Sequence, residues 1–134
     1  MTRINIVPPS ELYDQHLMAE YREIFMVPAA LKRSIASKKV YGIPKKYCLG
    51  TGHVKFFYDK GLYLFKRYNL LIEELLHRGY NLDPTRKFPI EAFPKQFYND
   101  WCPTEVDLKL IRSRINEKVN LKPEWYRKTT FINK

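Results

Sequence analysis

Three stretches of the chain carry apolar residues every three or four positions, and segments rich in proline and glycine, at 40–61 and 80–103, separate them. This spacing places the apolar side chains on one face of a helix, so the pattern predicts three main helices joined by long loops. No pair of segments shows convincing strand pairing. The chain has 134 residues, which suits one domain. The predicted fold class is therefore all-α (mostly helical), in a compact single domain over residues 1–134.

The first predicted helix follows the proline pair at positions 8 and 9. Ser10 is a candidate N-cap for a helix from Glu11. The positions that share one face of this helix are Leu12, His16, Ala19, Glu23 and Val27. Pro28 interrupts the helix, yet the residues after it favour helix again, so we expect a bent helix that ends before Ser37.

The other two helices are bounded by local signals. The second is expected over about 62–78, with Gly79 where a C-cap glycine belongs. The third is expected over about 105–121, between the candidate N-cap Thr104 and the helix-stopping Pro123. Their core-facing residues are expected to be Phe65, Tyr68, Ile72 and Leu75 on the second helix, and Leu108, Ile111, Ile115 and Val119 on the third.

The charge balance favours an anionic partner. Lys and Arg number 24 against 14 Asp and Glu, which gives a formal net charge of +10. An excess this large in a small chain favours nucleic acid as the partner, with a membrane surface as the second choice. Hydrophobic residues make up 45% of the chain, enough to build a core, so the chain does not belong to the disordered class.

The chain lacks the signals of membrane-spanning, secreted and zinc-binding proteins. It has no run of about 18 apolar residues and no signal-peptide stretch, so we expect no membrane segment. Its two cysteines, Cys48 and Cys102, make no disulfide framework, and neither lies at metal-ligand spacing from a second cysteine or a histidine. We therefore expect no metal and no cofactor, and a cytoplasmic location.

The amino terminus is the first candidate for chemistry. A small residue at position 2 favours removal of Met1, which would expose the α-amine of Thr2. The reference pKa of an α-amine is about 7.7–8.0, against about 10.4 for lysine, so roughly a tenth of it is unprotonated at neutral pH. Such an amine could attack a sugar carbon and form a Schiff base. Many proteins without this chemistry also begin with Met-Thr, so the pattern alone leaves an ordinary terminus open.

Glu23 is the second candidate. It lies two turns from His16 on the predicted face, among apolar residues, where a carboxylate is costly unless it has a partner or a role. It could serve as general acid or base for an amine nucleophile. The alternatives are a surface or ion-paired glutamate and, for His16, a packed and hydrogen-bonded histidine.

Basic and aromatic side chains form the third candidate. Arg114, Lys118 and Lys122 recur every four residues on one face of the third predicted helix. Further cations near the start of the chain are Arg3, Arg22, Lys32, Arg33, Lys38 and Lys39. Such cations contact phosphates, although a solvated charged face gives the same pattern. Trp125 and Tyr126, beside two basic residues, either stack on bases or pack against the core.

Several sequence blocks, in order and over nearly the whole chain, resemble one family. The longest blocks are Met1-Thr2-Arg3-Ile4-Asn5, Ser10-Glu11-Leu12 and the run from Asp14 to Glu23. A second region holds Leu49-Gly50, Gly52-His53-Val54 and Phe56-Phe57-Tyr58-Asp59-Lys60. The order continues with Arg78-Gly79, Glu117-Lys118 and Pro123-Glu124-Trp125-Tyr126. These blocks closely resemble the pyrimidine dimer DNA glycosylases of the phage endonuclease V type.

The resemblance implies a mostly helical domain that cuts the N-glycosidic bond at a damaged base and then nicks the strand at the abasic site. It implies that the α-amine of Thr2 attacks the anomeric carbon and that Glu23 supports this step and the β-elimination after it. The residues implied to line the site or to hold DNA are Arg3, Gln15, His16, Arg22, Arg114, Lys118, Trp125 and Tyr126. The implied partner is double-stranded DNA with damaged bases, from which a monomer flips out a nucleotide without a metal or cofactor, in a prokaryotic or phage-infected cell.

One departure from the family pattern concerns lesion choice. Ile24-Phe25-Met26 stands where dimer-specific relatives typically carry Leu-Pro-Arg, and Met26 cannot contact a phosphate ionically. Two alternatives to a dimer-specific enzyme therefore stay open. One is the same chemistry on another damaged base or on abasic sites only, and the other is a catalytically idle module that binds nucleic acid.

Overall fold

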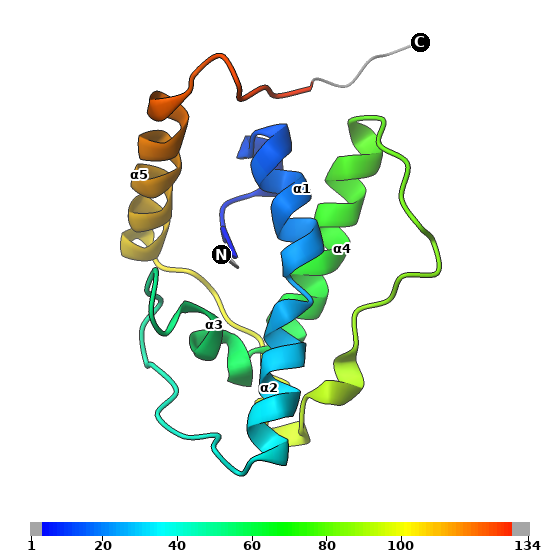
Figure 1. Ribbon diagram of the computed structural model, residues 1–134, viewed down its shortest axis with the longest axis vertical. Helices are drawn as coiled ribbons and strands as arrows, with labels where there is room; N and C mark the ends of the chain where they lie inside the picture. Colours follow the sequence, from blue (N-terminus) through cyan, green and yellow to red (C-terminus); the bar gives the residue numbers. More distant parts are fainter. Residues whose placement is uncertain (1–3, 130–134) are drawn as a thin grey trace.

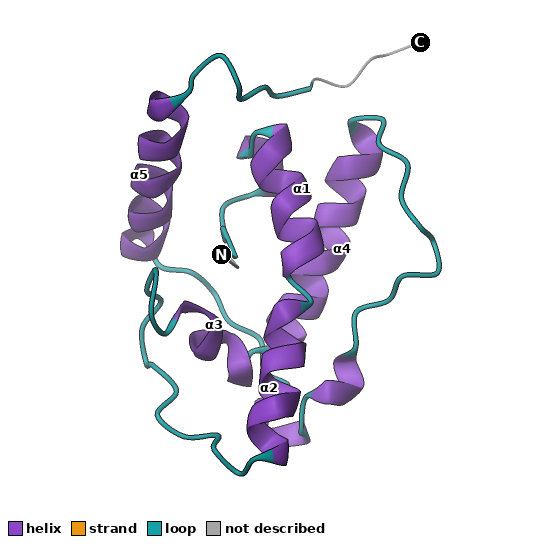
Figure 2. Ribbon diagram, viewed as in Figure 1, coloured by secondary structure: helices purple, strands orange, loops and turns teal. Residues whose placement is uncertain are grey.

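The computed structural model describes residues 4–129, and all regular structure in that range is helical, which confirms the all-α prediction (Figures 1 and 2). The long helices in this range are α1 (Asp14–Glu23), α2 (Met26–Ala36), α4 (Gly61–His77) and α5 (Glu105–Leu121). The described range also contains a short helix, α3 (His53–Phe56). It further contains 3₁₀ turns at Pro9–Glu11, Phe57–Asp59, Ile90–Ala92 and Lys95–Phe97.

The first described residues of the chain lie between two of the long helices (Figure 1). α1 and α2 follow one another as a column, and α4 runs back beside them in the opposite direction (Figure 1). α5 lies on the other side of α1, and the first described residues pass between the two helices (Figure 1). The segment after α5 returns across the beginning of α1, where the Asp14 N–H donates to the carbonyl of Arg127 at 2.7 Å.

The bent first helix is in fact two helices. The break lies at 24–25, one turn before Pro28, which is buried in the first turn of α2. Proline has no N–H to donate to the carbonyl of Ile24, and its ring would clash with that carbonyl in a continuous helix. Val27 donates to this carbonyl instead, at 3.4 Å. The predicted end of the helix before Ser37 is confirmed.

The predicted start of the first helix at Glu11 with Ser10 as N-cap is wrong. Ser10 lies inside the 3₁₀ turn Pro9–Glu11, and α1 begins only at Asp14. Between them the backbone at Leu12 is extended, with φ −79° and ψ 144°, and the Leu12 side chain is fully buried. Burial of Leu12 therefore decides the path of the chain here, before the helix can start.

The second and third predicted helices agree with α4 and α5. Gly79, with φ 93°, follows α4 as expected of a C-cap glycine. Thr104 caps α5, because its Oγ1 accepts from the Asp107 N–H at 3.2 Å and the Asp107 carboxylate accepts from the Thr104 N–H at 2.9 Å. Prediction of a loop over 40–61 missed α3 and the turn after it, where Phe56 and Phe57 are fully buried.

The core is formed by one face of each long helix together with the first described residues. On α4 the expected residues Tyr68 and Leu75 are buried, and the expected Phe65 and Ile72 are half-buried and packed against the core. The buried face of α4 also includes Leu64, Arg67 and Leu71. On α5 the expected face is correct: Ile111 and Ile115 are buried, with Leu108 and Val119 packed against the core. Within the described range, no helix is both long and apolar enough to span a bilayer.

Candidate active site

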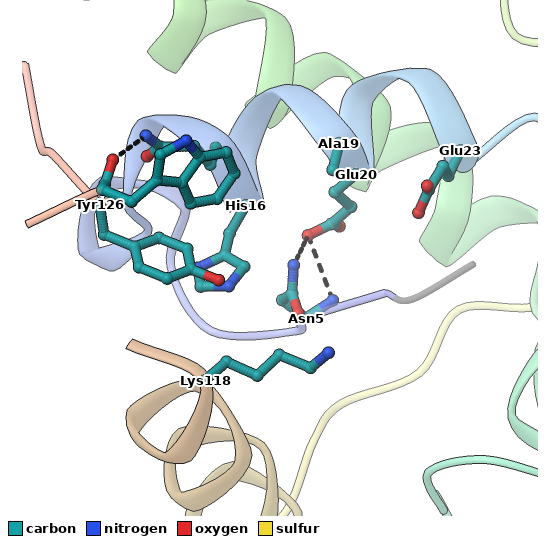
Figure 3. A pocket seen from close by; sticks show the side chains of 9 residues that line it. Asn5, His16, Ala19, Glu20, Glu23, Lys118 and Tyr126 are labelled. Atoms are coloured by element: carbon teal, nitrogen blue, oxygen red, sulfur yellow. Dashed lines mark hydrogen bonds between the residues drawn. The ribbon is translucent and has the colours of Figure 1, made fainter. Parts of the chain in front are cut away.

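A pocket of about 250 Å³ opens between α1, the first described residues, the end of α5 and the segment after it (Figure 3). Its lining residues are Asn5, Gln15, His16, Ala19, Glu20, Glu23, Lys118, Trp125 and Tyr126. Six of these are residues that we selected from the sequence for this site, and the pocket therefore brings them together: Gln15, His16, Glu23, Lys118, Trp125 and Tyr126.

A second hollow of about 730 Å³ lies next to this pocket and shares Gln15, Ala19, Glu23 and Trp125 with it. Its further lining residues are Asp14, Met18, Arg22, Tyr80 and Arg127. Residues four apart on a helix share a face, so Gln15, Ala19 and Glu23 form a stripe along α1 between the two hollows. We call the two hollows together the α1 groove.

Two carboxylates of α1 line the pocket, and they differ in environment. Glu20 is buried, and its Oε1 accepts from the backbone N–H of Asn5 at 3.1 Å and from the Asn5 side-chain amide at 3.0 Å. Its charge is balanced by Arg67 of α4. Glu23 is half-buried and lies on the same side of α1, one turn further along, at the border of both hollows (Figure 3). Glu23 is thus the carboxylate that a molecule in the α1 groove would meet.

Cations reach the groove from α5, from α1 and from the segment after α5. Lys118 extends from α5 across the pocket towards Asn5 (Figure 3). Arg22 of α1 is exposed and lines the second hollow together with Arg127. Arg114, which we also selected as a DNA contact, is exposed on α5, pairs with Glu117 at 3.1 Å and is not among the residues that line either hollow.

Aromatic rings close one end of the pocket. The rings of His16 and Tyr126 stack at a centroid distance of 4.8 Å, and Tyr13 meets the Tyr126 ring edge-on at 5.8 Å. Trp125 packs edge-on against Tyr126 at 4.9 Å and keeps 57% of its surface exposed. His16 is thus packed against aromatic rings, and Trp125 offers a large exposed surface to the α1 groove.

Gln15 holds the segment after α5 in place. Its side-chain Nε2 donates to the carbonyl of Trp125 at 2.5 Å, and its Oε1 accepts from the backbone N–H of Arg127 at 3.2 Å. Both ends of the amide are therefore engaged within the protein. A role for Gln15 in placing Trp125 beside the groove follows directly from these bonds.

Thr2 and Arg3 lie outside the described residues. Asn5, which we did not select from the sequence, lies in the pocket, and so does Glu20. A signal for the buried pair Glu20–Arg67 was present in the sequence, because Arg67 falls between the apolar positions Leu64 and Leu71 of a predicted helix. A cation on such a face requires a buried anion. Within residues 4–129, no group of three or more His, Cys, Asp or Glu side chains could hold a metal ion.

Comparison with protein families identifies the family of the chain. The model of the family described as pyrimidine dimer DNA glycosylase matches residues 1–88, which is 88 of the 134 residues. The match includes α1 with Gln15, His16 and Glu23, and it extends beyond α4. Lys118, Trp125 and Tyr126 lie after the matched region. The chain therefore belongs to the pyrimidine dimer DNA glycosylase family, whose members are enzymes that act on DNA.

Proposed function

We propose that this enzyme removes a base at UV-type pyrimidine dimers in double-stranded DNA and then cleaves the strand at the abasic site, through an imine formed by the α-amine of Thr2. The observation that carries the proposal is that Glu23 and Asn5 line one pocket. Thr2 precedes Asn5 by three residues, and three residues span at most about 11 Å. The α-amine is therefore within reach of the pocket that Glu23 borders.

The chemistry follows from the two groups. The nitrogen of the unprotonated amine bonds to C1′ of the deoxyribose, and the N-glycosidic bond breaks, with its electron pair leaving on the base. Loss of a proton and ring opening give the imine. Glu23 then accepts a proton from C2′, the C3′–O bond breaks and the 3′ phosphate leaves, which is the β-elimination. Water hydrolyses the imine and returns the free amine.

The charges around the groove support this chemistry. Only the unprotonated amine attacks, and positive charge nearby lowers the pKa of an amine because it disfavours a second cation. Lys118 in the first hollow and Arg22 in the second supply that charge. The same cations can contact the phosphates that flank a flipped nucleotide, and Trp125 offers a ring on which a base can stack.

Met26 favours a second candidate substrate within the same chemistry. It occupies the first position of α2, where 51% of its surface is exposed, and it has no charge to offer a phosphate. Another damaged base, or an abasic site alone, is therefore the alternative substrate. We also propose that a monomer carries out the reaction, because a site of this kind needs no second subunit.

Borohydride trapping tests the proposal. Protein is mixed with a UV-irradiated duplex, an abasic-site duplex or an undamaged duplex, and the adduct is located by peptide mapping. We expect an adduct on the α-amine of Thr2 with the first two duplexes. An adduct with the abasic duplex alone would support the alternative substrate. No adduct from protein shown to start at Thr2, with equal affinity for damaged and undamaged duplex, would leave a module that only binds nucleic acid.

Glu23→Gln tests the role of the carboxylate. The change removes the proton acceptor and keeps the size, so we expect strand cleavage to fall by about 10²-fold or more while the affinity for an abasic-site duplex is retained. Glu73→Gln is the matched control, since Glu73 is exposed on α4 and lies outside the α1 groove. Cleavage by Glu23→Gln at the rate of Glu73→Gln would show that the assigned role is wrong.

A further inference from the structure

The first described residues are held by buried side chains from distant parts of the chain. The Ile4 N–H donates to Nε2 of His53 at 2.8 Å, and the hydroxyl of Tyr47 donates to the carbonyl of Ile4 at 2.9 Å. Arg67 donates from a terminal guanidinium nitrogen to the carbonyl of Val7 at 2.5 Å. With the two bonds from Asn5 to Glu20, four side chains hold residues 4–7, and each of them is buried.

His53 is fixed in a single form by its two hydrogen bonds. Its Nε2 meets the N–H of Ile4, which can only donate, and its Nδ1 meets the carbonyl of Cys48, which can only accept, at 2.8 Å. The ring must therefore be neutral, with its proton on Nδ1. Its ring also packs edge-on against Tyr47 at a centroid distance of 5.4 Å. His53 is thus built to receive the backbone of Ile4.

The turn before α3 brings His53 to this position. Gly50 and Gly52 both have positive φ, at 75° and 91°. A Cβ at Gly52 would lie 3.3 Å from Pro44 and 3.4 Å from the Cys48 sulfur, so a side chain would be crowded there as well as strained. The family resemblance around Gly52-His53-Val54 therefore has a structural explanation: these residues form the turn that places His53 against Ile4.

The backbone between Asn5 and Val7 is strained. Ile6 has φ 50°, a value that a β-branched residue rarely adopts, and the Val7 N–H bonds to the Asn5 carbonyl at 2.5 Å across it. Such a turn persists only where the surroundings enforce it, and here side-chain bonds hold the chain on both sides of Ile6. Strain of this kind is concentrated at functional sites.

We propose that Glu20, Tyr47, His53 and Arg67 form a clamp that positions the α-amine of Thr2 for its attack on C1′. This inference rests on the proposed function and assigns these side chains as positioning residues. Thr2 precedes Ile4 by two residues, which span at most about 7 Å, so a fixed Ile4 confines the amine to a small volume. A misplacement of about 1 Å in a reacting group can cost about 10²-fold in rate.

Tyr47→Phe removes one bond of the clamp and keeps the ring. At saturating protein on an abasic-site duplex, we expect single-turnover trapping to slow about 10-fold, with the duplex affinity unchanged within about twofold. Tyr58→Phe is the matched control, because Tyr58 is equally buried and its hydroxyl lies 3.4 Å from Ser34, away from residues 4–7. Circular dichroism and thermal melting establish that both variants fold.

A glycine inserted between Arg3 and Ile4 distinguishes a positioning role of Tyr47 from a merely structural one. The insertion lengthens the connection to Thr2 and leaves the clamp intact, so we expect it to slow trapping at least 10-fold. In the lengthened chain the position of Ile4 no longer fixes the amine, and adding Tyr47→Phe should change the rate by less than about twofold.

The outcomes separate the two proposals. Trapping by Tyr47→Phe at the rate of Tyr58→Phe, or losses that multiply in the combined variant, would overturn the clamp and leave the imine chemistry in place. A wild-type protein that starts at Thr2 and forms no adduct there would overturn the proposed function, and the clamp with it, since it would then have no nucleophile to position.

Discussion

Arg67 and Glu20 form a buried, two-pronged ion pair beneath the pocket. Arg67 Nε lies 2.6 Å from Oε2 of Glu20, a second guanidinium nitrogen lies 3.0 Å from Oε1, and the side chains are 3% and 0% exposed. Burial alone would lower the pKa of Arg67, but the Glu20 carboxylate outweighs it and raises that pKa, so the guanidinium stays charged. The pair joins α4 to α1 and, through Asn5, to the start of the chain.

Replacing Arg67 by Met should destabilise the fold strongly. The substitution leaves the Glu20 carboxylate buried without its cation, and we expect the free energy of unfolding in urea at pH 7 to fall by about 3–5 kcal/mol. Lys66→Met is the control in the neighbouring residue, because the pair of Lys66 with Asp100 is exposed and should contribute no more than about 1 kcal/mol. Equal losses of unfolding free energy in Arg67→Met and Lys66→Met would contradict the claim that the buried pair contributes more than the exposed one.

Asp14 should make stability depend on pH in the acid range. Burial alone would raise the pKa of the Asp14 carboxyl, but hydrogen bonds from the side chain and backbone of Thr129 and from Arg78 hold it below its ordinary value of 3.8. A folded-state pKa below the unfolded one gives a stabilisation that is complete above the unfolded-state pKa and is lost as the pH falls through the folded-state pKa.

Thermal melting of Asp14→Asn measures this stabilisation. We expect a lower Tm than that of the wild type at pH 6, and a difference that shrinks below about pH 4 as the wild-type carboxylate becomes protonated. Asp83→Asn should change the Tm much less, because Asp83 is exposed and its carboxylate accepts hydrogen bonds from Thr85, two residues away, rather than joining distant segments. A Tm difference that stays constant from pH 6 to pH 2 would refute the assignment to Asp14.

Lys118 should account for part of the salt dependence of DNA binding. If Lys118 contacts a phosphate as proposed, Lys118→Met takes that contact away, so we expect weaker binding to any duplex and a slope of log affinity against log salt reduced by about one. Lys109→Met is the control on the same helix, since nine residues at about 100° each place Lys109 on the opposite face of α5. Titrations at several salt concentrations should show an unchanged slope for Lys109→Met, and the same slope for both variants would argue against the contact.

Local signals predicted much of the fold. The end of the first helical region before Ser37, the extent of α5 and the Thr104 cap depend on residues that are close in sequence, such as the pair Thr104 and Asp107. Capping bonds and proline stops operate over three or four residues, so a sequence contains them whole. The start of α1 was not predicted, because it depends on the burial of Leu12 in the core, which the local sequence does not specify.

Part of the candidate site was predicted from the sequence, but the periodicity of apolar residues did not by itself identify the face of α1 that borders the pocket. We expected Leu12, His16, Ala19, Glu23 and Val27 to share one face of a helix, with Glu23 partly buried. Glu23 is half-buried as expected, but Leu12 and Val27 are buried outside α1, and α1 itself buries Leu17, Glu20 and Tyr21. The three expected positions that do lie on α1, His16, Ala19 and Glu23, line the α1 groove. A helix covered on both sides has two partly apolar stripes, and a sequence does not show which of them meets the core and which borders a pocket.

The bonds that assemble the site connect residues far apart in sequence. Glu20 and Arg67 are separated by 47 positions, Ile4 and His53 by 49, and Gln15 and Trp125 by 110. Such pairings depend on how the helices pack, which no local pattern specifies. The family resemblance predicted Gln15 and Trp125 as site residues, but the hydrogen bond between them became visible only in the structure.

Gln15 should determine where Trp125 lies. Gln15→Glu keeps the side-chain size and an acceptor for Arg127, removes the donor to the Trp125 carbonyl and sets a carboxylate against that oxygen. We therefore expect the segment from Trp125 to leave the α1 groove, because an unpaired carbonyl facing a negative charge is unfavourable. The chain has two tryptophans, so ¹⁹F NMR of protein labelled with 5-fluorotryptophan gives one resonance for Trp125 and one for Trp101.

The expected spectrum is specific. The Trp125 resonance should shift and narrow in Gln15→Glu, since a released side chain moves faster, while the Trp101 resonance, from a ring packed against Phe56 and Tyr47, stays in place and serves as an internal standard. Gln96→Glu adds the same charge on an exposed turn and should leave both resonances unchanged. An unmoved Trp125 resonance in Gln15→Glu would mean that the ring contacts with Tyr126, rather than the Gln15 amide, hold this segment beside the groove.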